Sequence, residues 1–200
     1  DNADFTFWTA EQQEAFWADI DQAGAAFAQE IVDYCIANGY MNGTSANVFS
    51  PAGTVTRAQL VTILYRVDGE KAVTTSGTFT DVAAGEWYSD AIEWAAANGV
   101  VNGKGEGKFD PMGAITREQI AAILYRYSGS PAVEGDLSAF PDAKKASSYA
   151  VDALVWATGE GLINGISSKG VTTLSPQEKA TRAQIASIIM RFLGGEYKCG

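Results

Sequence analysis

The sequence predicts a mostly all-α protein made of three copies of one helix-loop-helix unit. A helix-start motif, Thr-Arg-x-Gln, occurs three times, and each copy runs into apolar residues at helical spacing. Landmark residues recur about every sixty positions, whereas strand signals are weak and at most a few loop residues are expected to extend. One such helix pair cannot bury both of its faces, so the three units are expected to pack together.

The chain opens with a segment that has no counterpart downstream. We expect a leader helix in residues 1–15, because Thr9-Ala10-Glu11-Gln12 has the spacing of a helix cap. The three repeats are expected at 16–70, 71–130 and 131–195, and a short tail at 196–200. The Asn-Gly pairs that begin at positions 42, 102 and 164 lie 60 and 62 residues apart, and the third repeat carries three extra residues around Ser167 to Gly170.

Each repeat begins with an aromatic residue two positions before an aspartate. These aspartates are Asp19, Asp81 and Asp142. Six to eight residues later a second aromatic residue opens the first helix, and these aromatics are Phe27, Trp87 and Tyr149. The helix ends at a glycine, and a loop rich in Gly, Ser and Asn leads through a proline to the second helix.

The second helix of each repeat starts with a capping box at Thr56, Thr116 or Thr181. In such a box the Thr hydroxyl accepts a hydrogen bond from the N–H at the third helical position. The Gln side chain in turn accepts from the N–H of the cap residue. The sequence therefore predicts three helices with well-defined first turns.

The six arginines occupy only two equivalent positions of the repeat. Arg57, Arg117 and Arg182 stand at the first helical position, where the helix dipole disfavours a cation by up to about 1 kcal/mol. The others lie nine residues further on, near helix C-termini that favour a cation: Arg66, Arg126 and Arg191. We interpret this second set as structural and the first set as functional, with a negative partner beside each motif arginine.

Composition excludes several classes of function. The net charge of −10 argues against broad binding to nucleic acid or to an anionic membrane, and no apolar run approaches the length of a membrane span. The chain has no histidine, so it lacks the commonest general base and metal ligand, and we expect neither a metal site nor a cofactor. No signal segment opens the sequence, which therefore reads as a mature or excised piece.

Cys35 and Cys199 are the only cysteines. Cys35 lies within an apolar helical pattern, so a buried thiol is the first interpretation. A disulfide with Cys199, in the Gly-flanked tail, stays open as an alternative.

Together, several segments of the second repeat resemble the S-layer homology (SLH) repeat. They are Phe79-Thr80-Asp81-Val82, Trp87-Tyr88, Trp94-Ala95, Asn102-Gly103, Phe109-x-Pro111 and Thr116-Arg117-Glu118-Gln119. The likeness covers roughly residues 16–194 in three copies, with Gln in place of the family's Glu at the end of each motif. It implies a compact pseudo-threefold helical bundle at the bacterial cell-wall surface. Such bundles anchor exported proteins to an anionic secondary cell-wall polysaccharide, often one that ends in a pyruvylated sugar.

The resemblance and the arginines together predict ligand-binding grooves between repeats. Arginine binds carboxylates through two parallel hydrogen bonds, and the helix start beside it would offer free N–H groups to the same anion. An aromatic ring would cover the sugar, and an aspartate would accept from hydroxyls or orient the arginine. The expected sets are Arg57 with Asp81 and Trp87, Arg117 with Asp142 and Tyr149, and Arg182 with Asp19 and Phe27.

Other interpretations remain open. The aspartates could cap or pair locally, the aromatics could pack in the core, and the arginines could serve structural ion pairs. No enzymatic activity is expected, because carboxylates that recur once per repeat form equivalent sites, whereas a glycosidase needs two different ones. The alternative function is a protein–protein module for surface-lattice assembly, including self-assembly of the parent protein, which would expose an apolar patch instead of arginines.

Overall fold

The computed structural model describes residues 31, 34–43, 50, 52–74 and 76–194. Within these residues the protein is mainly helical, as predicted. The elements are α3 (Arg57–Val67), α4 (Ser89–Ala97), α5 (Arg117–Tyr127), the 3₁₀ turns η1 (Ala143–Lys145) and η2 (Ser148–Ala150), α6 (Val151–Gly159), β1 (Ile166–Ser168), β2 (Val171–Thr173) and α7 (Arg182–Phe192).

The three capped helices begin where the motifs predict. At α3 the N–H of Gln59 donates to Thr56 Oγ1 at 3.2 Å, and the N–H of Thr56 donates back to Gln59 Oε1 at 2.9 Å. Thr181 and Gln184 repeat both bonds at α7, and the Thr116 N–H donates to the Gln side chain at α5. The capping-box prediction is therefore confirmed.

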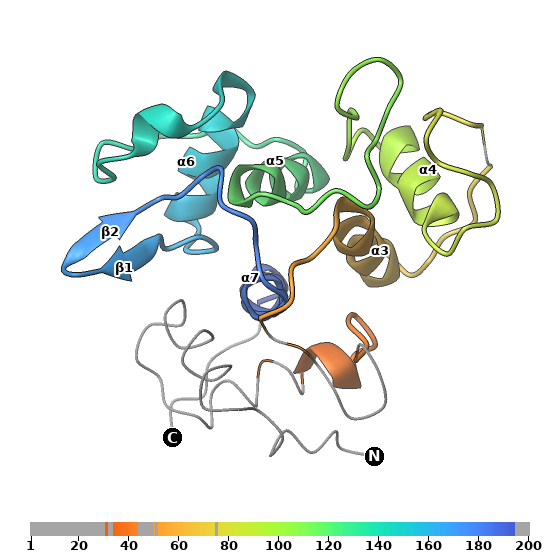
Figure 1. Ribbon diagram of the computed structural model, residues 1–200, viewed down its shortest axis with the longest axis horizontal. Coiled ribbons are helices and arrows are strands. Elements are labelled where there is room, and N and C mark those ends of the chain that lie inside the picture. Colours follow the sequence, from red (N-terminus) through yellow and green to blue (C-terminus); the bar gives the residue numbers. More distant parts are fainter. Residues whose placement is uncertain (1–30, 32–33, 44–49, 51, 75, 195–200) are drawn as a thin grey trace.

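The capped helices α3, α5 and α7 gather around the centre of the molecule (Figure 1), while α4 packs outside α3 and α6 packs outside α5. A closed cycle of three backbone hydrogen bonds joins the segments that lead into them. Val55 N–H donates to Ala180 O at 3.2 Å, Ala180 N–H to Ile115 O at 3.0 Å, and Ile115 N–H to Val55 O at 2.9 Å. These three residues are fully or almost fully buried, so the axis of the pseudo-threefold bundle lies in its core.

The three extra residues of the third repeat lie in a small antiparallel hairpin, residues 166–173. Strands β1 and β2 pair Ser168 with Val171, so the turn is Lys169-Gly170. Both turn residues have positive φ, 51° and 78°, which matches the twist of two-residue hairpin loops. The insertion thus lies in a partly exposed hairpin, and α7 keeps the eleven-residue length of α3 and α5.

Cys35 carries a free thiol that is fully buried, as first interpreted. Its Sγ lies 3.6 Å from the carbonyl oxygen of Ala186 in α7, and burial raises the pKa of the thiol to about 12. Cys199 and the expected leader helix at 1–15 lie outside the described residues. None of the helices in the described part has the length and apolarity that a bilayer span requires.

Candidate functional site

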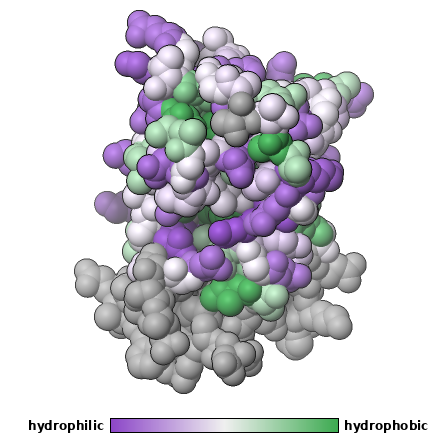
Figure 2. Space-filling model, turned by 90° about the vertical axis from the view of Figure 1, so that its right-hand side faces the viewer, coloured by the Kyte–Doolittle hydropathy of each residue, from purple (hydrophilic) through white to green (hydrophobic). Residues whose placement is uncertain are grey.

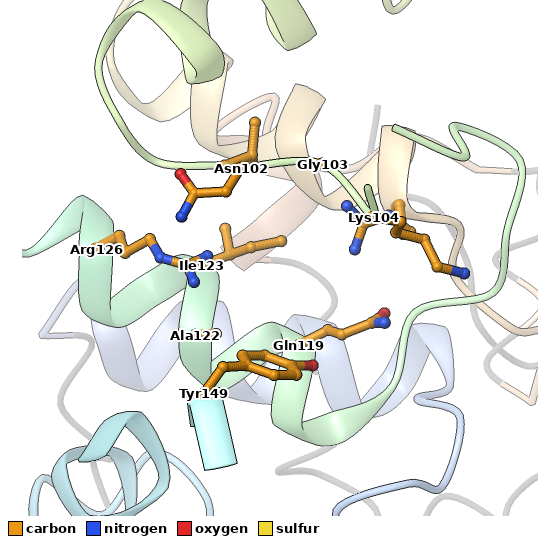
Figure 3. A pocket seen from close by; sticks show the side chains of 10 residues that line it. Asn102, Gly103, Lys104, Gln119, Ala122, Ile123, Arg126 and Tyr149 are labelled. Atoms are coloured by element: carbon orange, nitrogen blue, oxygen red, sulfur yellow. The ribbon is translucent and has the colours of Figure 1, made fainter. Parts of the chain in front are cut away.

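A cavity of about 410 Å³ opens over one side of α5, and we call it the Arg57 pocket. It receives side chains from all three repeats. Its lining consists of Arg57, Val101, Asn102, Gly103, Lys104, Gln119, Ala122, Ile123, Arg126 and Tyr149. In Figure 3, Asn102, Gln119, Arg126 and Tyr149 surround the same open space.

The Arg57 side chain lines this pocket and is held by contacts with Phe109 of the next repeat. Its Nε donates to the carbonyl oxygen of Phe109 at 2.8 Å, and its guanidinium carbon lies 4.5 Å from the centroid of the Phe109 ring. Asp81 fixes the backbone at that point by accepting from the N–H groups of Phe109 and Asp110, both at 2.8 Å. The orientation of the Arg57 side chain is thus set by the carbonyl group and the ring of Phe109.

The guanidinium of Arg57 is buried but not neutralised. The residue is 5% exposed, and burial lowers the pKa of the guanidinium, although Arg remains charged at physiological pH. Its Nη atoms have no hydrogen bond to any described residue, and no described carboxylate lies within ion-pair distance. A partly desolvated cation of this kind favours an anionic partner entering the pocket.

Arg126 and Gln119 were not among the predicted site residues, yet both line the Arg57 pocket. They are seven residues apart on α5, which is two helical turns, so their side chains share one face. This spacing was the available signal. The interpretation of the second arginine set as structural fits Arg66, which donates to Tyr40 O, and Arg191, which donates to Leu162 O, whereas the Arg126 side chain has no hydrogen bond to a described residue. The Gln119 Oε1 atom serves the helix cap, and its amide group faces the same cavity wall.

Tyr149 lines the same pocket from the middle of η2 and is 52% exposed. Its Oη donates to Glu118 Oε1 at 3.0 Å. Partial burial, followed by the charge and hydrogen bond of Glu118, raises the pKa of the Tyr149 phenol to about 12. The hydroxyl is therefore engaged with the protein and stays protonated at neutral pH.

The other two motif arginines line cavities of equivalent composition. The Arg182 pocket, of about 150 Å³, lies over α3 and includes Asn42, Gln59, Arg66 and Trp87. The Arg117 pocket, of about 20 Å³, lies over α7 and includes Asn164, Gln184 and Arg191. Each pocket therefore combines a motif arginine from one repeat with Asn-Gly, Gln and the second arginine of the next repeat.

The expected pairing of arginines with aromatics is wrong by one repeat. Tyr149 lies with Arg57 and not with Arg117, and Trp87 lies with Arg182 and not with Arg57. The physical reason is that the Arg57 and Arg182 pockets each lie over a capped helix, and the aromatic residue that lines each of these two pockets belongs to the repeat packed outside that helix. Asp19 and Phe27, expected with Arg182, lie outside the described residues.

Asp81 and Asp142 have a local structural role in the described chain, one of the interpretations left open. Asp142 accepts from the N–H groups of Leu174 at 2.7 Å and Ser175 at 2.8 Å, as Asp81 does in the second repeat. The Leu174 carbonyl then accepts from Arg117 Nε at 3.0 Å. Each aspartate is therefore joined to its expected arginine through one intervening residue.

The expectation of free N–H groups at the helix starts is also corrected. Arg57 N–H donates to Gly113 O, and Ala58 N–H donates to Pro111 O, both at 2.9 Å. The loop of the next repeat thus occupies the donors that an anion would have used. These two backbone donors are therefore not open to a ligand.

The amino-acid sequence is similar to those of known proteins. A model of the S-layer homology domain matches residues 18–61, 78–121 and 139–186, one match within each expected repeat. The chain is 32% identical to the surface-layer 125 kDa protein of Lysinibacillus sphaericus and 32% identical to an amylopullulanase of Thermoanaerobacterium thermosulfurigenes, each over 84% of the chain. It is 30% identical to S-layer protein EA1 of Bacillus anthracis over 70% of the chain. The matched regions are 14%, 9% and 15% of those relatives, so the chain corresponds to a small part of each.

Proposed function

Because this chain belongs to the S-layer homology domain family, whose members are non-catalytic cell-surface anchoring modules, we propose that it binds an anionic cell-wall polysaccharide. The bound group would be a carboxylate such as that of a pyruvylated sugar, held by the guanidinium groups of the inter-repeat pockets. The chain would thereby attach its parent protein to the outside of the bacterial wall.

The observation that carries this proposal is the charge of the Arg57 pocket. On a chain of net charge −10, three cations line one cavity: Arg57, Lys104 and Arg126. Lys104 is paired with Asp110 at 2.8 Å, whereas the two arginines have no carboxylate partner among the described residues. A local cationic cavity in an acidic protein favours a small anionic group over an extended polyanion.

The alternative of a lattice-forming protein–protein module finds less support. Five large hydrophobic side chains are exposed among the described residues, and two of them, Trp87 and Tyr149, line pockets beside arginines. The face in Figure 2 is mainly hydrophilic, and its hydrophobic side chains form small separate patches. Neither feature resembles the contiguous apolar surface of a stable protein interface.

Cosedimentation with purified wall sacculi tests the proposal. The chain should pellet with intact sacculi and stay in solution with sacculi from which the secondary polymer has been chemically removed. Arg126→Ala should weaken binding by roughly 10- to 100-fold, the value of one charge-assisted hydrogen bond of about 1.5–3 kcal/mol.

Lys144→Ala is the matched control, because it removes one positive charge at an exposed position that lines none of the three pockets. Equal binding to stripped and intact walls would refute the proposal. Equal losses in Arg126→Ala and Lys144→Ala would show that attraction depends on overall charge and not on the pocket.

A further inference from the structure

Glu118 is a buried carboxylate beside the Arg57 pocket. The residue is 3% exposed and stands in the first turn of α5, directly before Gln119 of the pocket wall. Its two oxygens accept three hydrogen bonds: from Ser147 N–H at 2.9 Å, Ser147 Oγ at 2.8 Å and Tyr149 Oη at 3.0 Å. A buried carboxylate is stable only when it is satisfied in this way, so Glu118 ties the start of α5 to the turn that carries Tyr149.

The three residues of this network occur together at one of the three repeat junctions. The equivalent positions between the first and second repeats are Ala58, Gly85 and Trp87. Those between the third and first repeats in sequence are Ala183, Ala25 and Phe27. Of the three junctions, the one with the tyrosine hydroxyl is thus also the one with the glutamate that accepts from it and the serine that donates to the same glutamate.

Trp87 is held in a different way. It contacts Tyr88 edge-on, with ring centroids 5.1 Å apart. The residue after Tyr149 is Ala150, which offers no ring. Tyr149 thus lacks a ring contact of this kind and donates a hydrogen bond to Glu118 instead.

We propose that Glu118 is a positioning residue of the Arg57 pocket, which holds the Tyr149 ring in place for contact with the apolar face of a bound sugar. This inference rests on the proposed glycan-binding function. The phenol hydroxyl is engaged with Glu118, so the ring is the part of Tyr149 that the ligand meets. A ring that is fixed before binding loses less freedom when the sugar arrives.

A double-mutant cycle on intact wall sacculi tests this role. Glu118→Ala frees the ring and should weaken binding roughly 2- to 10-fold, the cost of ordering one side chain. Tyr149→Phe keeps the ring but removes the hydroxyl and should weaken binding similarly. Glu118→Ala should cause no further loss in the Tyr149→Phe background. Glu118→Gln should restore part of the affinity, because its amide oxygen can accept from both hydroxyls, while its NH2 group cannot accept from the Ser147 N–H.

Glu93→Ala is the matched control for loss of a buried carboxylate. Glu93 is 3% exposed and accepts four hydrogen bonds from Ser76 and Thr78, but it lines none of the three pockets. The Glu93→Ala substitution should lower the stability of the protein without changing its affinity for the sacculi. If Glu118→Ala binds like the wild type, or loses as much affinity in the Tyr149→Phe background as in the wild type, the positioning role is refuted.

A measurement without ligand separates this inference from the proposed function. The ionisation of Tyr149 is obtained by ultraviolet titration, as the difference between each protein and its Tyr149→Phe counterpart. The pKa of Tyr149 should be lower in Glu118→Ala than in the wild type, because the charge and the hydrogen bond of Glu118 are lost while the partial burial of the phenol remains. An unchanged ionisation would overturn the inference whether or not the chain binds walls. Equal binding of the wild type to stripped and intact walls would refute the proposed function, and the sugar contact with it, while a lowered ionisation pH in Glu118→Ala would still establish the hydrogen bond that holds the ring.

Discussion

At the scale of single residues, Arg57 combines a role in the fold with the ligand-binding role that we propose for it. The Nε of Arg57 and the face of its guanidinium serve the fold, through the carbonyl and the ring of Phe109. The Nη atoms remain available to the pocket. Arg126 differs, because it lines the pocket without a hydrogen bond to any described residue.

These roles predict different costs for the two arginines. Arg57→Ala leaves the Phe109 carbonyl unsatisfied in the interior and should lower the free energy of unfolding by about 1–3 kcal/mol as well as weaken wall binding. Arg126→Ala should change the free energy of unfolding by less than about 0.5 kcal/mol. Urea denaturation of both variants checks this, and an Arg57→Ala variant as stable as the wild type would contradict the bracing role.

At the scale of elements, the loop before each capped helix matters more than the helix start itself. The loop places Gly113 O and Pro111 O on the first N–H groups of α3, and it presents the Phe109 carbonyl to Arg57. Asp81, near the start of the same repeat, accepts hydrogen bonds from two N–H groups of this loop. Gly103 lies in the same region at φ 73°, and an added Cβ would come 2.6 Å from Lys108 O and from the Phe79 ring, so the Asn-Gly motif is sterically fixed.

The Asp81 contact predicts an acid-sensitive loop. Burial alone would raise the pKa of Asp81, but the N–H groups of Phe109 and Asp110 outweigh it and hold the pKa below its ordinary value of about 3.9. A carboxyl whose pKa is depressed in the folded state stabilises the protein above its unfolded pKa. That contribution is lost as the pH falls through the folded value. Stability should therefore decline below about pH 4.

Asp81→Asn is the variant that tests this contact. The amide can accept from only one of the two N–H groups, so the free energy of unfolding at pH 7 should fall by about 1–3 kcal/mol. The variant should also lose less stability than the wild type between pH 5 and pH 2, a range set by the ordinary Asp pKa of about 3.9. Asp90→Asn, at an exposed position in α4, is the control. Parallel pH profiles for Asp81→Asn and wild type would argue against the contact.

At the scale of the whole molecule, sequence reasoning succeeded where the signal was local or periodic. The capping boxes located α3, α5 and α7, and the sixty-residue period gave the three units. It failed where the answer depended on how the repeats pack. Nothing in the sequence alone indicated that Trp87 would face Arg182, or that a loop carbonyl would occupy the N–H of Arg57. The seven-residue spacing from Gln119 to Arg126 was informative, but a cation near a helix C-terminus already had a sufficient structural explanation.

The closed backbone cycle predicts that the three repeats fold as one unit. The Val55 carbonyl accepts from Ile115 N–H, and the Val55 N–H donates to the Ala180 carbonyl. A fragment that lacks the first repeat therefore loses two of the three hydrogen bonds of the cycle. A chain of residues 71–194 would also lose α3, against which α4 packs, and with it Arg57. The full chain should unfold in urea in one transition that tryptophan fluorescence and far-ultraviolet circular dichroism report identically. The fragment should unfold at lower urea and should not bind intact sacculi. A fragment with the midpoint of the full chain would instead show that the repeats are independently stable and that closure contributes little to the fold.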